Sequence, residues 1–277
     1  MQLMDEALRN CPIGVFDSGI GGLTVVKELL NIMPYEDIIY FGDTARLPYG
    51  SKSNRLVTRY SVENSIFLSS KNVKMIVIAC NTASAASSDY LRSFIKFPVI
   101  GVIECGALGA VRLTRNKRVG VIGTKSTINS GAYSKAINNL DSEIKVFELP
   151  TPLLVHLVEE NWIKKNITKT ILAEYLEPLL ENDIDTLILG CTHYPLLKEQ
   201  IHKITNKISL VDSSKEIAIL VLNTLKIQNI LSTRKEPGTT SVFLSDMHPE
   251  FSKWAKEFLG KEITANLIDI EQHGLSA

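Results

Sequence analysis

The stretch Met75-Ile-Val-Ile-Ala-Cys80-Asn-Thr82 decides the fold, because the chain contains it twice in similar form. Its counterpart, Thr186-Leu-Ile-Leu-Gly-Cys191-Thr-His193, again joins a short apolar run to a cysteine and polar side chains. A second pair stands before them in the same order, Ile13-Gly-Val-Phe16 and Val119-Gly-Val-Ile122. One such match arises easily by chance, since strand-turn-helix units resemble one another. Two matches in the same order, at nearly the same offset, indicate two similar halves.

Short apolar runs alternate with amphipathic stretches along most of the chain. The runs are rich in Val and Ile and lack period-2 alternation, as is typical of parallel strands covered on both faces. They occupy residues 13–16, 38–41, 75–79, 99–103, 119–122, 187–189 and 209–211. Helical spacing predicts helices over 25–33, 172–180, 217–225 and 251–258. Ser213 to Glu216 read as a capping box that opens the third of these helices. Residues 228–240 read as a loop. The alternation predicts an α/β fold of two pseudo-symmetric domains. We expect each domain to have a mainly parallel sheet flanked by helices, and we expect the active site in the cleft between the two domains.

Composition excludes several classes of protein. The 277 residues carry 30 Lys and Arg against 30 Asp and Glu, so a nucleic-acid partner is not expected, because phosphate binding needs a surplus of cations. No apolar run approaches the length that spans a bilayer, and MQLMDEALRN lacks the apolar core of a signal peptide, so we expect a cytoplasmic protein without a membrane partner. The four cysteines form no Cys-x-x-Cys pair and no zinc-type cluster, so no metal is expected, and Cys11 and Cys105 read as structural.

Phe16-Asp17-Ser18-Gly19-Ile-Gly21-Gly22 brings a buried strand into polar side chains and glycines. Glycines let a ligand approach the backbone closely and leave N–H groups free to hold an anion. Thr24 stands where a dinucleotide-binding fingerprint would have its third glycine, so that fingerprint is incomplete. No Lys-Ser/Thr pair follows the glycines, so the segment is not a P-loop either. Asp17 could therefore serve a ligand site or simply cap the next helix.

Cys80 and Cys191 each end an apolar run and precede an expected helix, whose N-terminus would favour the thiolate. A single cysteine there would more often be a small buried hydrophobe. Two in matching positions favour a function. If the halves face each other across a cleft, one thiolate can remove a proton from a carbon centre while the other thiol protonates the opposite face. Asp17 and His193 are the neighbours available to adjust the protonation of the two thiols. The loop at Tyr49 reads either as a turn or as a ligand contact.

Four motifs in combination resemble the glutamate racemase family. They are Val15-Phe-Asp17-Ser18-Gly-Ile-Gly-Gly22, Gly42-Asp-Thr-Ala-Arg-Leu-Pro-Tyr49-Gly50, Ala79-Cys80-Asn81-Thr82-Ala-Ser84 and Leu189-Gly-Cys191-Thr192-His193-Tyr-Pro-Leu196. The resemblance spans about residues 12–213. It implies interconversion of L- and D-glutamate for peptidoglycan synthesis, by two cysteines, without pyridoxal phosphate or metal. It implies catalytic roles for Cys80, Cys191, Asp17, His193 and Glu159, and substrate binding by Asp17, Ser18, Tyr49, Gly50, Asn81, Thr82, Thr124, Thr192 and His193.

The resemblance also carries expectations about architecture. It implies a discontinuous first domain, residues 12–98 plus 212–277, and a second domain, residues 99–211, with a possible homodimer. Two positions depart from the family pattern, since the family usually has proline at Cys105 and at His156. The second departure lies close to Glu159 and bears on the geometry around that residue.

Three other interpretations compete with this one. Asp17 at a strand end is loosely similar to a phosphatase nucleophile, but Gly19 stands where that chemistry normally needs a second acid. A redox or metal-binding thiol pair would leave no room for a substrate between the sulfurs. A non-catalytic amino-acid-binding module fits two lobes with a cleft, but gives the paired cysteines no purpose.

Overall fold

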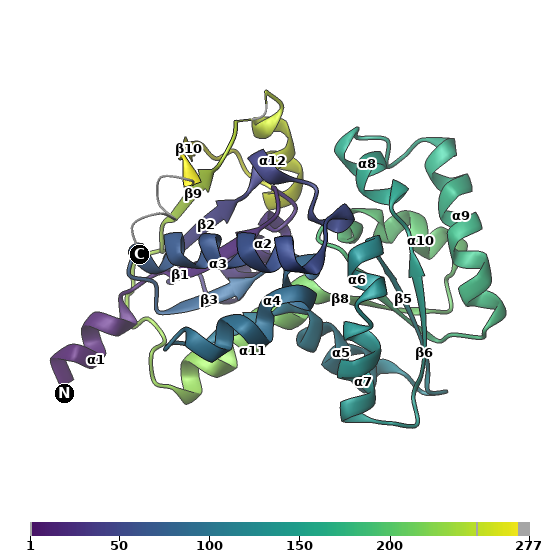
Figure 1. Ribbon diagram of the computed structural model, residues 1–277, viewed down its shortest axis with the longest axis horizontal. Coiled ribbons are helices and arrows are strands. Elements are labelled where there is room, and N and C mark those ends of the chain that lie inside the picture. The colour runs from purple at the N-terminus through teal and green to yellow at the C-terminus, as the bar shows by residue number, and fades with distance from the viewer. Residues whose placement is uncertain (1, 248, 271–277) are drawn as a thin grey trace.

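The computed structural model describes residues 2–247 and 249–270, and within these ranges the strands form two parallel sheets. One has six strands in the order β10-β9-β2-β1-β3-β4, and the other has four in the order β6-β5-β7-β8. The larger sheet contains β1 (Ile13–Asp17), β2 (Ile38–Gly42), β3 (Met75–Ile78), β4 (Val99–Gly101), β9 (Thr240–Leu244) and β10 (Ala265–Leu267). The smaller contains β5 (Arg118–Gly123), β6 (Lys145–Pro150), β7 (Thr186–Gly190) and β8 (Ser209–Asp212). Each sheet lies in its own lobe (Figure 1).

The two sheets share a strand order. The run β2-β1-β3-β4 of the larger sheet corresponds to β6-β5-β7-β8 of the smaller, and every pair in both runs is parallel. The repeated sequence pairs fall on corresponding strands: β1 matches β5, and β3 matches β7. The predicted α/β fold with two similar halves is therefore confirmed.

Helices flank both sheets, and the apolar stripes seen in the sequence face inward. Their bounds are α1 (Gln2–Arg9), α2 (Leu23–Ile32), α3 (Asn54–Ser70), α4 (Asn81–Phe94), α5 (Val102–Leu113), α6 (Lys125–Asn129), α7 (Ala132–Leu140), α8 (Leu153–Glu159), α9 (Asn166–Glu181), α10 (Lys198–Ile204), α11 (Ser213–Ile227) and α12 (Phe251–Leu259). Helix α11 follows β8 of the smaller sheet and packs against both α2 and α5. It therefore contacts both lobes.

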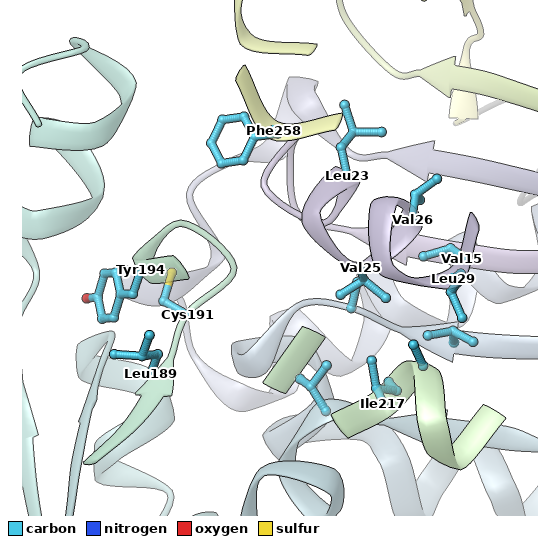
Figure 2. Close-up of a cluster of buried hydrophobic side chains, with 14 of the residues drawn as sticks. Val15, Leu23, Val25, Val26, Leu29, Leu189, Cys191, Tyr194, Ile217 and Phe258 are labelled. Carbon is cyan, nitrogen blue, oxygen red and sulfur yellow. The ribbon is translucent and has the colours of Figure 1, made fainter. Parts of the chain in front are cut away.

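One cluster of buried side chains continues through both lobes. Val15, Val25 and Leu29 belong to it in the larger lobe, and Leu189 and Cys191 in the smaller (Figure 2). Burial of this apolar surface, worth about 25 cal/mol per Å², stabilises each half and the contact between them. Cys191 thus belongs to the shared core.

Two local expectations are wrong. The run 99–103 is a strand only to Gly101, after which Val102 and Ile103 already belong to α5. A Cβ at Gly101 would collide with Ser84 Oγ, so this position suits the close approach of the strand end to α4. The predicted capping box does not form, because Asp212 is the N-cap and accepts a hydrogen bond from Ser214 N at 2.9 Å.

Strands β6, β9 and β10 lie outside the apolar runs identified from the sequence. β6 is a partly exposed edge strand, so it lacks a continuous apolar signal. β9 and β10 extend the larger sheet beyond β2, which returns the C-terminal segment to the first half of the fold. β4 pairs with β3, so the larger sheet extends past residue 99. The division into 12–98 plus 212–277 and 99–211 stays a prediction.

No helix in the described ranges is long and apolar enough to cross a membrane. The C-terminal helix predicted over 251–258 is α12, which ends at Gly260 in the left-handed conformation, as a helix-terminating glycine does. His248, which precedes Pro249 ahead of this helix, lies outside the described residues.

Candidate active site

The carboxyl ends of strands from both sheets open into one cavity of about 700 Å³, which falls within the range of ordinary small-molecule sites. It is lined from the first half by Ser18, Tyr49, Gly50, Cys80, Asn81 and Thr82, and from the second half by Thr124, Glu159, Cys191, Thr192 and His193. The structure therefore brings together the predicted site residues, with the exception of Asp17, around a single space between the halves.

Cys80 is the N-cap of α4, two residues after the end of β3. Ala83 N donates to its sulfur at 3.5 Å, and the thiol lies 3.6 Å from Ser18 Oγ. Burial, reinforced by the negative charge of Asp17, raises the pKa of Cys80 to about 12. At neutral pH the Cys80 side chain is consequently a thiol, ready to donate a proton.

Asp17 is fully buried behind the glycine-rich turn and is not among the residues that line the cavity. Its Oδ2 accepts a hydrogen bond from Gly19 N at 3.1 Å. Burial raises the pKa of Asp17, although the charge of His193 and nearby backbone N–H groups act in the opposite direction. Helix α2 has Gly22 as its N-cap and no side-chain cap, so the interpretation of Asp17 as a mere helix cap is wrong. Substrate binding by Asp17 stays a prediction.

Cys191 has different surroundings. No α-helix begins there, because a turn and a short 3₁₀ helix (Tyr194–Leu197) follow β7, so the expected helix N-terminus is absent. An imidazole takes that place: Cys191 Sγ lies 3.7 Å from His193 Nδ1. His193 Nε2 in turn lies 3.2 Å from Glu159 Oε1.

Opposing effects act on His193. Burial alone would lower its pKa, but the hydrogen bonds with Cys191 and Glu159 raise it to about 10. His193 is therefore an imidazolium at neutral pH, held between a sulfur and a carboxylate. The cavity thus has a buried thiol on one side and a sulfur beside a charged imidazole and a carboxylate on the other, which suits proton transfer to opposite faces of one carbon.

Comparison with known proteins agrees with this geometry. The Asp/Glu/Hydantoin racemase family model matches residues 38–220. A glutamate racemase of Geobacter metallireducens is 47% identical over 96% of this chain and 97% of its own length. The chain belongs to the glutamate racemase family. Membership of this family makes the chain an isomerase of the amino-acid racemase class.

Solved members of the family share the whole fold. Glutamate racemase of Francisella tularensis, crystallised with D-glutamate, is 40% identical with a TM-score of 0.90, and the match covers 95% of this chain and 99% of that one. The Escherichia coli enzyme, in complex with L-glutamate and an activator, is 31% identical with a TM-score of 0.71, covering 90% and 92% of the two chains. Both lobes and the cleft are therefore features of the family fold.

Threonine hydroxyls join the two halves beside Cys80. Thr82 Oγ1 lies 2.9 Å from Thr124 Oγ1 and 3.1 Å from Thr127 Oγ1, and these two lie 3.0 Å apart. Asn81, next to Thr82, accepts a hydrogen bond from Tyr133 in the second half at 2.6 Å. The start of α4 is thereby tied to the opposite lobe.

The loop at Tyr49 lines the cavity, where a ligand contact would place it, and that contact stays a prediction. The Tyr49 hydroxyl donates to Asp43 and accepts from Asn64 Nδ2 at 3.2 Å, so it is engaged inside the protein. Gly50 approaches the other lobe so closely that a Cβ would lie 2.7 Å from Thr124 Cβ. Glycine at this position lets the two halves meet.

Sequence reasoning missed the cavity wall formed by the C-terminal segment, which contributes Asp246, Glu250 and Trp254. Trp254 Nε1 donates to the backbone oxygen of Glu159 at 3.1 Å, across the cleft. The helical pattern of 251–258 was visible, but nothing local indicated that α12 faces the catalytic cavity. Among the described residues, no group of three or more His, Cys, Asp or Glu side chains could hold a metal ion.

Proposed function

We propose that this protein interconverts L- and D-glutamate without a cofactor and supplies D-glutamate for peptidoglycan synthesis. One observation carries the proposal: Cys80 and Cys191, from corresponding strand ends of the two sheets, line the same cavity. Two acid/base groups on opposite sides of a stereocentre are what inversion by proton transfer requires. The similarity to family members crystallised with D-glutamate and with L-glutamate supports the choice of substrate.

In one direction, the Cys191 sulfur removes the Cα proton while the Cys80 thiol gives its proton to the opposite face. The Cα–H bond breaks, an S–H bond forms at Cys191, and the electron pair left on Cα takes the proton of Cys80. The protonated His193 beside Cys191 supports this direction with its positive charge. The reverse direction exchanges the two roles, so each sulfur faces one enantiomer.

The substrate must also be held and its developing charge stabilised. We assign this to Ser18, Asn81, Thr82, Thr124 and Thr192, with the loop Tyr49–Ser51, since each lines the cavity. Hydroxyl, amide and backbone donors aimed at the substrate carboxylate stabilise the carbanion-like transition state. Asp17 acts behind Cys80 through its buried carboxyl group, and Glu159 acts through His193.

Incubation with L-glutamate in D₂O, without added cofactor, tests the proposal. Inversion by two thiols places deuterium at Cα of the D-product. Unlabelled product, or a requirement for pyridoxal phosphate, would overturn the mechanism. A binding module would retain glutamate affinity and show no turnover.

Two further expectations belong to the same proposal. The enzyme acts in the cytoplasm, where cysteines stay reduced, as acid/base thiols require. A homodimer, implied by the family resemblance, is checked by the molar mass of the protein measured in light scattering.

A further inference from the structure

A buried cluster of charged and polar side chains lies behind the loop that forms one wall of the cavity. Asp43 follows β2 and is fully buried. Arg46 Nε donates to both oxygens of the Asp43 carboxylate, at 3.0 Å to Oδ1 and 2.8 Å to Oδ2. The carboxylate also accepts hydrogen bonds from Ser245 Oγ at 3.0 Å and from the Tyr49 hydroxyl. The proposed racemisation uses neither Asp43 nor Arg46, although both belong to a motif noted in the sequence.

Arg46 connects this carboxylate to α3. Its guanidinium donates to Glu63 and, at 3.1 Å, to Asn64 Oδ1, and it lies 4.1 Å from the centre of the Tyr60 ring. Asn64 donates back to Tyr49, which closes the cluster. Only 14% of the Arg46 side chain is exposed.

The electrostatics of the cluster favour a geometric role over a stabilising one. Burial would lower the pKa of Arg46, but Asp43 and Glu63 keep it above its ordinary value, so the guanidinium is charged. Burying charged groups carries a desolvation penalty in free energy, whereas burying apolar side chains of similar size carries none. The cluster instead fixes the position of the Arg46 side chain, because a guanidinium binds two carboxylates through a rigid planar fork.

The loop Leu47–Ser51 follows Arg46 directly, and all of it lines the cavity. Gly50 in this loop stands against Thr124 of the other lobe, and Thr124 is hydrogen-bonded to Thr82, two residues after Cys80. The position of the loop therefore sets the width of the cleft beside one of the thiols.

We propose that Arg46 is a positioning residue for the substrate: its fork, anchored on Asp43 and Glu63, holds the loop 47–51 as a fixed wall of the cavity. The inference rests on the proposed function for its kinetic readout. Lysine would keep the charge but not the fork.

The test compares Arg46→Lys with Arg59→Lys. Arg59 also pairs with Glu63, at 2.9 Å, but its side chain is 74% exposed, so it is a matched control. In R46K we expect the KM for both glutamate enantiomers to rise about 10-fold or more, and kcat to fall by less, because a displaced wall weakens binding before it affects proton transfer. In R59K both constants should stay at wild-type values.

Amide hydrogen exchange without substrate gives a second readout. Residues 44–51 should exchange faster in R46K than in R59K or wild type. An unchanged KM and unchanged exchange in folded R46K, or equal changes in R59K, would overturn the role of Arg46. Should R46K fail to fold, Glu63→Gln decides, with a smaller rise in KM and the same faster exchange expected. If wild type does not turn over glutamate, the proposed function fails, and hydrogen exchange still decides the role of Arg46.

Discussion

The two catalytic halves place a cysteine at the same point and surround it differently. Cys80 and Cys191 follow the corresponding strands β3 and β7. Cys80 begins a helix and has the buried carboxylate of Asp17 nearby, whereas Cys191 begins no α-helix and contacts the imidazole of His193. Topology therefore sets where each sulfur lies, and the two sulfurs have unlike neighbours.

This difference has a chemical purpose. Inversion in one step needs one sulfur that donates a proton and one that accepts a proton. Two identical environments would favour the same protonation state on both sides. Burial and a nearby carboxylate keep Cys80 as a thiol, while His193 supplies positive charge beside Cys191. Two similar halves can form a two-base site because the residues around Cys80 differ from those around Cys191.

The largest effect should come from removing either sulfur. Cys80→Ala and Cys191→Ala should each lower the racemisation rate by about 10²–10⁴-fold or more, the contribution of one positioned acid/base group. The remaining sulfur can still remove and return the proton of the enantiomer that it faces. We therefore expect each variant to exchange Cα–H for deuterium in one enantiomer only, and the two variants to select opposite enantiomers.

Proton NMR of L- and D-glutamate in D₂O measures both quantities separately. Near wild-type racemisation in either variant would show that the assignment of the two sulfurs is wrong. Exchange of the same enantiomer by both variants would contradict their placement on opposite sides.

A smaller effect is expected from the neighbour of Cys191. His193→Gln removes the charge held between Cys191 and Glu159 and should lower kcat by about 10²-fold, the lower end of the range for a proton-transfer residue. Asp17→Asn should cost less, because burial already shifts Asp17 towards its protonated form. Steady-state rates in both directions check the order. A larger loss in D17N would mean that the Cys80 side depends on a charged carboxylate.

Much of this asymmetry was beyond sequence reasoning. The repeated motifs predict two halves and two facing cysteines because apolar runs and their spacing are local properties of the chain. The motif around Cys191 contains Pro195, but the replacement of a helix by a 3₁₀ turn also depends on the burial of Tyr194, which only the folded chain shows. The exclusion of Asp17 from the cavity likewise depends on how the glycine-rich turn folds over it.

Long-range contacts account for most of the remaining omissions. Trp254 reaches Glu159 from the C-terminal helix, and Ser245 reaches Asp43 from the end of β9. Neither pairing leaves a periodic or compositional signal. The motif containing Arg46 was visible, but its role depends on Glu63, which a helix brings close only in the folded chain.

The charge on His193 should also appear in stability. Its pKa rises from 6.5 in the unfolded chain to about 10 in the fold, so folding favours the protonated form. The resulting stabilisation is fully present below pH 6.5 and is lost as the pH rises towards 10. We expect the free energy of unfolding of wild type to fall over this window by on the order of 5 kcal/mol more than that of H193Q. Urea unfolding at several pH values measures the difference, and parallel pH dependence in both proteins would contradict it.

The smallest effect should come from the second imidazole that faces Glu159. His156 Nδ1 lies 3.8 Å from Glu159 Oε2, but the His156 side chain is 67% exposed, whereas that of His193 is 9% exposed. Exposed ion pairs contribute about 0–1 kcal/mol, because water and salt screen them. We therefore expect His156→Gln to change kcat and KM by less than about threefold, in clear contrast to H193Q. Kinetics at low and high salt check this, and a loss in H156Q equal to that in H193Q would show that Glu159 needs both imidazoles. In that case, burial would not explain why one imidazole partner of Glu159 matters more than the other. The functional difference would remain only between the surroundings of Cys80 and those of Cys191.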